Sequence, residues 1–164
     1  MNEADVTHLS LPALPPGVQP LCNGSALRKA GRRLALLYGA VLAPSGLRQS
    51  QHSLLAHIER AGGPTISALA AEMVLDRSAL SHNLKPMVRD GFVALERDAT
   101  DGRARRVVLT PAGQAKLQET KALWNVAHAR FERLFGEPKA QQLRALLEEI
   151  YSDEFAQAFG ADAN

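Results

Sequence analysis

The sequence predicts a mainly α-helical fold that carries one small β-hairpin. Hydrophobic residues make up 46% of its 164 positions but aromatic residues only 5%, a balance typical of helical cores built from leucine and alanine. Apolar residues recur every three or four positions along most of the chain, as they do in amphipathic helices. Residues 92–110 instead have the length and content of two short strands around a polar turn. A chain of this length is the usual size of a single domain with a buried core.

Two amphipathic helices are predicted in the first part of the chain. Apolar spacing places the first from Ser25 to about Ala43, where Pro44-Ser45-Gly46 ends it. The second runs from about Arg48 to Ala61 and stops at Gly62-Gly63-Pro64.

A helix-turn-helix is predicted next. Thr65 is a suitable N-cap for a short helix over residues 66–73, and Asp76 is a suitable N-cap for a longer helix that ends near Gly91. The brief Val74-Leu75 link joins the two helices. Helical spacing predicts an inward-facing set at Leu69, Ala70, Ala79, Leu80, Leu84, Met87 and Val88.

The β-hairpin is expected between residues 92–96 and residues 105–110. The connecting segment contains the pair Asp101-Gly102, which favours a tight turn. Thr110 followed by Pro111 then predicts an N-cap with proline at the first helical position.

The last third of the chain is predicted to be helical up to about Phe135 and again from Pro138 to Phe159. Its apolar stripe consists of Leu117, Leu123, Trp124, Phe131, Leu134, Leu143, Leu146, Leu147, Ile150 and Phe155.

The chain resembles the MarR family of bacterial transcriptional regulators. The residues that carry the resemblance follow the spacing D-x-R-x(5)-L-T-x-x-G and are Asp101, Arg103, Leu109, Thr110 and Gly113. Further support comes from Ala68-Leu69-Ala70, Asp76, Leu84 and Asp90-Gly91-Phe92-Val93, and the resemblance covers residues 25–160.

The resemblance implies a winged helix-turn-helix lobe plus a helical dimerisation region, assembled as a homodimer on a palindromic operator in double-stranded DNA. The expected parts are a flexible Pro-rich N-terminal arm over residues 1–20, a dimerisation helix over 21–46, the DNA-binding lobe over 47–113 and C-terminal dimerisation helices over 114–164. It also implies that Asp101 helps to shape the wing and that Arg103 enters the minor groove.

Local charge agrees with DNA as the partner, although the formal net charge of +2 does not by itself indicate nucleic acid. A helix in the major groove needs donors three and four positions apart, and the face opposite the apolar stripe offers Arg77, Ser78, Ser81, His82 and Lys85. Cations that can reach phosphates or the minor groove are concentrated around the hairpin at Arg97, Arg103, Arg105 and Arg106.

Pro86 complicates the longer helix of the helix-turn-helix. It removes the bond that its N–H would make to the carbonyl of His82, which costs about 3 kcal/mol in mid-helix. The helix is expected either to bend there or to end early, and both outcomes weaken Lys85 and Arg89 as groove readers. Base choice is therefore expected to rest on Arg77, Ser78, Ser81 and His82.

An effector site is expected between the dimerisation helices and the lobe, because members of the family often bind small aromatic carboxylates or phenolics there. Arginine pairs well with a carboxylate, and tryptophan or tyrosine can stack on a ring. The candidate residues are Ser25, Arg28, Arg32, Tyr38, Arg48, His52, Trp124 and His128. The predicted function is a repressor released by such a ligand.

Two other functions stay open. Cys22 could act as a thiol or oxidant sensor if it lies at a helix N-terminus, although the chain holds no second Cys to resolve an oxidised form. A winged helix could also serve as a protein-interaction module, which would show no salt-dependent binding to a promoter fragment.

Other classes of function find no support in the sequence. It contains no Gly-rich phosphate loop, G-x-S-x-G elbow or H-E-x-x-H pair, so no enzyme activity is expected. His52 and His57 are five positions apart and do not share a helical face, so neither a metal nor another cofactor is expected. The acidic N-terminus does not read as a signal peptide, and a single Cys fits a reducing cytoplasm, which is the expected location.

Overall fold

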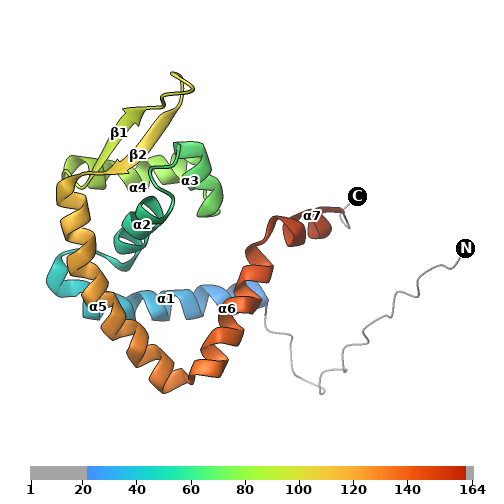
Figure 1. Cartoon of the computed structure of the whole chain (residues 1–164). Helices are drawn as coiled ribbons and strands as arrows, with labels where there is room; N and C mark the ends of the chain where they lie inside the picture. Colours follow the sequence, from blue (N-terminus) through green and yellow to red (C-terminus); the bar gives the residue numbers. More distant parts are fainter. Residues whose placement is uncertain (1–21, 162–164) are drawn as a thin grey trace, which may run out of the picture. The chain divides into compact units, whose positions relative to one another are not determined.

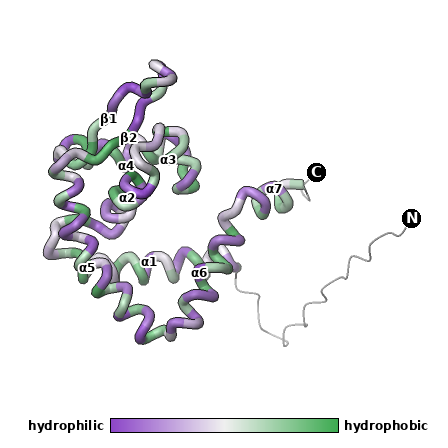
Figure 2. Tube along the Cα trace, in the orientation of Figure 1, coloured by the Kyte–Doolittle hydropathy of each residue, from purple (hydrophilic) through white to green (hydrophobic). Residues whose placement is uncertain are grey.

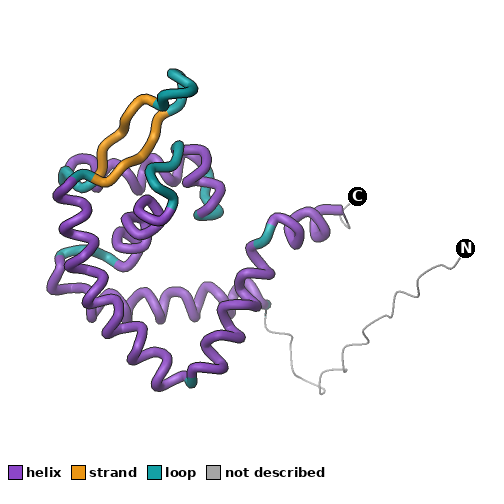
Figure 3. The backbone as a smooth tube through the Cα atoms, in the orientation of Figure 1, coloured by secondary structure: helices purple, strands orange, loops and turns teal. Residues whose placement is uncertain are grey.

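The computed structural model describes residues 22–161, so the predicted N-terminal arm over residues 1–20 lies outside the described residues. The chain divides into two compact units, Met1–Leu34 and Ala35–Asn164. The elements are α1 (Asn23–Leu42), a short 3-10 turn (Ala43–Ser45), α2 (Gln49–Arg60), α3 (Ile66–Glu72), α4 (Arg77–Arg89), β1 (Val93–Arg97), β2 (Arg105–Leu109), α5 (Pro111–Phe135), α6 (Glu137–Tyr151) and α7 (Asp153–Ala161) (Figure 1). The predicted fold class, mainly α with a β-hairpin wing, is confirmed (Figure 3).

Side-chain caps begin three of the helices in the larger unit. The Thr65 hydroxyl accepts a hydrogen bond from the Ala68 amide at 3.2 Å, and the Asp76 carboxylate accepts one from the Ala79 amide at 2.7 Å. The Thr110 hydroxyl likewise accepts from the Gly113 amide at 3.0 Å. All three predicted caps are confirmed, because capping depends only on a few neighbouring residues.

One hydrophobic core joins α2, α3, α4, the base of the hairpin and the start of α5. Its fully buried members include Leu55, Leu69, Leu80, Met87 and Val107. Val88 was expected to face inward, but that prediction is wrong, since Val88 is 39% exposed. The core needs only one of two neighbouring positions at this turn of α4, and Met87 fills it.

Pro86 does not end α4, which continues to Arg89. The expectation that the helix ends early is therefore wrong. The Pro86 carbonyl still accepts a hydrogen bond from the Asp90 amide at 2.9 Å, so the last turn is formed. Gly91, at a φ of 76°, then turns the chain into β1, a conformation that costs glycine little.

The hairpin is a two-stranded antiparallel sheet whose register runs from Val93 opposite Leu109 to Arg97 opposite Arg105. Its second strand is also tied to the turn between α2 and α3. The Val107 amide donates to the Pro64 carbonyl at 2.8 Å, and Thr65 forms an isolated bridge with Arg106. The wing is thus anchored to the helix-turn-helix at its base, while its tip stays free (Figures 1 and 3).

The C-terminal segment differs from the prediction, which had one helix from Pro138 to Phe159. The helix is interrupted at Ser152. The hydroxyl of Ser152 accepts a hydrogen bond from the Phe155 amide at 3.1 Å and caps the start of α7. Large apolar side chains here and at the end of α5 remain exposed, including Leu134 (77%), Leu146, Ile150, Phe155 and Phe159 (74%). Figure 2 shows hydrophobic and hydrophilic stretches alternating along α5 and α6.

Candidate DNA-binding surface

The exposed face of α4 carries all five polar side chains that the sequence assigned to it. Arg77, Ser78, Ser81, His82 and Lys85 are exposed, whereas Leu80 and Leu84 are buried beneath them. The buried leucines fix the rotation of α4, so its donors point to solvent. Such a row of donors can reach base edges in a major groove.

The wing tip is organised by two carboxylates. Asp98 accepts hydrogen bonds from the Thr100 amide at 2.9 Å, the Thr100 hydroxyl at 2.5 Å and the Asp101 amide at 2.9 Å. Asp101 accepts from the Arg103 amide at 3.0 Å, and its carbonyl accepts from the Ala104 amide at 2.8 Å. The bonds from the Thr100 hydroxyl and from the two amides lower the pKa of Asp98 to about 2.

Sequence reasoning found Asp101 but missed Asp98. The signal was present, because an Asp two residues before a Thr is typical of a turn in which the carboxylate accepts from the backbone. The two carboxylates together hold Arg103 on the outer end of the wing.

Arg106, which the sequence predicts as a DNA contact, also bonds within the fold. The Nε of Arg106 donates to the Gly63 carbonyl at 2.6 Å, and its Nη2 donates to the Gly62 carbonyl at 2.9 Å. Both glycines have positive φ values, 64° and 80°, so their carbonyls are turned toward the wing by a backbone that other residues rarely adopt. The guanidinium of Arg106 clamps the wing to the α2–α3 turn, whereas Arg97, Arg103 and Arg105 are exposed.

A hollow of about 660 Å³ lies between the start of α4 and the wing. It is lined by Arg77 and Ser81 from α4 and by Arg103 and Arg105 from the wing. The fold therefore brings together two groups of residues that are more than twenty positions apart in the sequence. A surface that presents base-reading donors beside wing cations matches what a winged helix needs to bind DNA.

The joint between wing and α5 explains the end of the sequence motif. The Thr110 hydroxyl donates to the Gly91 carbonyl at 2.6 Å, and the Thr110 amide donates to the Phe92 carbonyl at 3.1 Å. A β-carbon on Gly113 would lie 1.9 Å from that same Phe92 oxygen. Only glycine fits at this position.

Comparisons with known proteins agree with this geometry. A family model described as the MarR family matches residues 45–104. The transcriptional regulator MosR of M. tuberculosis, whose structure was solved in complex with DNA, is 37% identical; the match covers 77% of this chain and 93% of the MosR chain, with a TM-score of 0.69. The chain belongs to the MarR family.

Other solved MarR-family structures have the same fold. A transcriptional regulator of this family from Rhodococcus sp. RHA1 is 26% identical over 79% of this chain and 94% of its own, with a TM-score of 0.68. CouR from Rhodococcus jostii RHA1, bound to p-coumaroyl-CoA, is 25% identical over 79% and 91%, with a TM-score of 0.67. The search of curated proteins returned no match. MarR-family proteins are transcriptional regulators that bind DNA, so the chain is a DNA-binding transcriptional regulator.

Three of the residues predicted for the effector site of this MarR-family protein lie together. The rings of His52 and Trp124 are stacked with centroids 6.1 Å apart, and those of Trp124 and His128 with centroids 4.5 Å apart. His52 and Trp124 also line a hollow of about 350 Å³ between α2 and α5, together with Lys121 and Arg60. Sequence reasoning missed Lys121.

His52 is buried and hydrogen-bonded to α5. Its Nδ1 lies 2.8 Å from Thr120 Oγ1, which also lies 3.0 Å from the carbonyls of Lys116 and Leu117. Burial lowers the pKa of His52, and the charge of Lys121 lowers it further, so the neutral ring is favoured near pH 7. The neutral ring has one donor and one acceptor nitrogen.

Two other predicted effector residues of the larger unit, Arg48 and Tyr38, do not line this hollow. Arg48 precedes α2 and lines a separate hollow beside α4. Tyr38 is half-buried, and its pKa is raised by burial and by the charge of Glu132, with Arg144 opposing. Ser25, Arg28 and Arg32 belong to the unit Met1–Leu34, where Ser25 is half-buried and the two arginines are exposed.

Residues 22–161 contain no group of three or more His, Cys, Asp or Glu side chains placed to hold a metal ion. No helix in this range combines the length and the apolar character that a membrane crossing requires.

Proposed function

We propose that this MarR-family regulator is a homodimeric repressor that leaves its operator when it binds a small aromatic carboxylate or phenol. The observation that carries the DNA half is the hollow in which Arg77 and Ser81 of α4 face Arg103 and Arg105 of the wing. In this proposal α4 reads the major groove through Arg77, Ser78, Ser81 and His82. Arg103 at the wing tip enters the minor groove, and Arg97 and Arg105 bind phosphates. As a DNA-binding regulator it would act in the cytoplasm.

The exposed apolar side chains of the C-terminal helices support the homodimer. Leu134 and Phe159 are 77% and 74% exposed, and large exposed apolar side chains often mark a surface that another protein covers. A second copy of the chain that covers these helices would bury them. Two symmetric lobes would then read the two halves of a palindrome.

The cluster of His52, Trp124 and Lys121 supports the aromatic effector. Trp124 offers a ring face, and Nε2 of His52 can form a hydrogen bond with a phenolic hydroxyl. Lys121, which lies 3.7 Å from the Glu59 carboxylate in the same hollow, would exchange that partner for the carboxylate of the ligand. CouR, a relative at 25% identity, is a transcriptional repressor and has been solved both with p-coumaroyl-CoA and on a DNA duplex. This chain is proposed to combine the same two abilities with a ligand of simpler class.

The test begins with operator duplexes selected by the full chain from a random-sequence pool. Fluorescence anisotropy with the selected duplex is then measured for the wild type and for Arg77→Ala, which should lose about 1–3 kcal/mol of sequence-specific binding. Para-hydroxybenzoate should release the duplex, cyclohexanecarboxylate should not, and Trp124→Leu should abolish release while DNA binding remains. Failure to select any duplex would reject the DNA role, and release that is indifferent to the aromatic ring would reject the effector class.

Cys22 keeps a second candidate open, a thiol-sensing regulator. Cys22 is exposed, and its carbonyl accepts hydrogen bonds from the Ser25 and Ala26 amides, so the thiol stands at the start of α1. An accessible thiol at a helix N-terminus is favoured for reaction with oxidants. Under this alternative hydrogen peroxide releases the duplex from the wild type but not from Cys22→Ser.

A further inference from the structure

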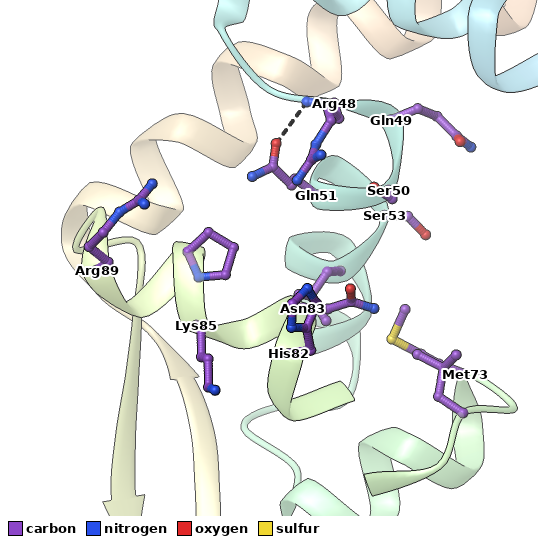
Figure 4. A pocket seen from close by; sticks show the side chains of 13 residues that line it. Arg48, Gln49, Ser50, Gln51, Ser53, Met73, His82, Asn83, Lys85 and Arg89 are labelled. Carbon is purple, nitrogen blue, oxygen red and sulfur yellow. Dashed lines mark hydrogen bonds between the residues drawn. The ribbon is translucent and has the colours of Figure 1, made fainter. Parts of the chain in front are cut away.

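A second hollow, of about 780 Å³, lies on the other flank of α4 from the wing. Its lining combines the segment that leads into α2, through Arg48, with the later part of α4, through Lys85 and Arg89. Figure 4 shows Arg89 at the end of α4, Lys85 in the middle of the helix and Arg48 across from them at the start of α2. It shares no residue with the hollow beside the wing.

The lining of this hollow is positively charged and contains no carboxylate. Its remaining polar side chains include Gln49, Ser50 and Asn83, which are neutral donors. The hollows beside the wing and beside Trp124 contain Asp98 and Glu59 respectively, so they differ from it in this respect. The start of α2 adds the partial positive charge of a helix N-terminus. Charge complementarity therefore favours an anion.

The three cations remain available for a partner. The backbone amide of Arg48, not its side chain, is bonded to Gln51 Oε1 at 2.9 Å, so the guanidinium is not needed for capping (Figure 4). Arg89 forms an ion pair with Asp90 through Nε at 2.8 Å, and its two terminal nitrogens have no hydrogen-bond partner among residues 22–161. Arg48, Lys85 and Arg89 are all exposed.

The position of the hollow points to one source of anions. A helix that lies in a major groove about 12 Å wide has a phosphate backbone on each side. The wing occupies one flank of α4, and the Arg48 hollow occupies the other. Because α4 continues through Pro86 to Arg89, Lys85 and Arg89 both belong to the helix and line this second flank.

We infer that Arg48, Lys85 and Arg89 form a second DNA-backbone site that binds phosphates on the side of α4 opposite the wing. This inference rests on the proposed DNA-binding role and moves Arg48 out of the effector site. Contacts to phosphate fix the register of a protein on DNA but carry no sequence information. The lobe would then straddle the groove, held by the wing on one backbone and by this site on the other.

The experiment measures the affinity of the full chain for its selected duplex and for a scrambled duplex over a series of salt concentrations. Arg48→Gln and Arg89→Gln are each expected to lower the slope of log affinity against log salt by about 0.9, equally for both duplexes. Lys139→Gln, which removes the same charge from an exposed position on α6, is the matched control and should leave the slope unchanged. Circular dichroism confirms that each variant is folded.

The outcomes separate this inference from the proposed function. The inference alone is overturned if the wild type selects a duplex but Arg48→Gln and Arg89→Gln show the same slope of log affinity against log salt as the wild type. A wild type that selects no duplex overturns both. If Arg48→Gln keeps the slope but loses the thermal shift produced by benzoate, the hollow is an effector site and the inference is wrong. Ethylation interference gives an independent readout, since a phosphate whose ethylation blocks the wild type should cease to matter for Arg48→Gln.

Discussion

Gly113 lies so close to Phe92 that a β-carbon at Gly113 would stand 1.9 Å from the Phe92 carbonyl oxygen. That oxygen also accepts the Thr110 amide, so the first turn of α5 is pressed against the start of the wing. Contacts below 3.0 Å cannot be absorbed when the neighbour is backbone. The glycine of the family motif therefore fixes where α5 leaves the DNA-binding lobe.

Gly113→Ala is predicted to destabilise the protein by about 3 kcal/mol or more, because either the α5 backbone or β1 must move. Urea denaturation followed by circular dichroism measures the loss. Gly39→Ala is the matched control, since Gly39 is also helical and nothing lies within 4 Å of its added β-carbon. The control should change stability by no more than about 1 kcal/mol; equal effects at the two sites would contradict the contact.

Arg106→Ala is predicted to lower both folding stability and DNA affinity, whereas Arg103→Ala is predicted to lower DNA affinity alone. Removal of Arg106 frees the carbonyls of Gly62 and Gly63 and should cost about 1–2 kcal/mol of folding stability as well as DNA affinity. Removal of Arg103, which is exposed, should cost about 1–3 kcal/mol of DNA binding and leave the unfolding midpoint unchanged. Denaturation and anisotropy on both variants decide the matter, and loss of stability in Arg103→Ala would refute its assignment.

Asp98 is predicted to make the wing tip sensitive to acid. Its pKa is about 2 in the fold and 3.8 in the unfolded reference, so its contribution is fully present above pH 3.8 and is lost as pH falls toward 2. The amide signals of Thr100 and Asp101 in NMR should shift with a midpoint near 2. Asp98→Asn should remove that transition, and a midpoint near 3.8 in the wild type would argue against the hydrogen bonds.

His52 is predicted to make stability depend on pH at a higher pH than Asp98 does. Because its pKa is lowered below 6.5, the unfolded chain takes up a proton first as the pH falls, so stability declines from pH 6.5 downward until His52 is protonated in the fold as well. Thermal unfolding over this range measures the slope. His52→Gln should flatten it, whereas His82→Gln, at an exposed position, serves as the control.

Val74→Asn is predicted to stabilise the helix-turn-helix by about 1 kcal/mol. Val74 has a φ of 52° in the α3–α4 turn, a left-handed conformation that is unfavourable for a β-branched residue and tolerated by Asn. Its side chain is 66% exposed, so little packing is lost. A fall in the urea midpoint of this variant would mean that the valine side chain makes a contact worth more than the relieved strain.

The sequence was most informative where structure depends on near neighbours. Caps at Thr65, Asp76 and Thr110 need only a side-chain oxygen and an amide three residues away, so they could be predicted. The break at Ser152 had a similar local signal, and the apolar spacing on both sides of it concealed that signal.

Sequence reasoning failed where a residue's role depends on a distant partner. Arg106 reads as one more wing cation until its distance to the Gly62 and Gly63 carbonyls is known. Arg48 and His52 are one helical turn apart, yet they line different hollows. Periodicity could not choose between Met87 and Val88 either, because adjacent positions on a helix differ by only 100° and the shape of the core decides.

The Thr110 hydroxyl joins the end of α4 to the start of α5. It caps α5 and at the same time donates a hydrogen bond to the carbonyl of Gly91, which lies between α4 and the wing. At a rise of 1.5 Å per residue, α5 extends roughly 37 Å from Thr110, and Trp124 lies roughly 21 Å along it. Under the proposed function, a ligand bound at Trp124 would act near the middle of α5, and a tilt of α5 would be passed through Thr110 to the end of α4 and thus to the proposed DNA-binding surface.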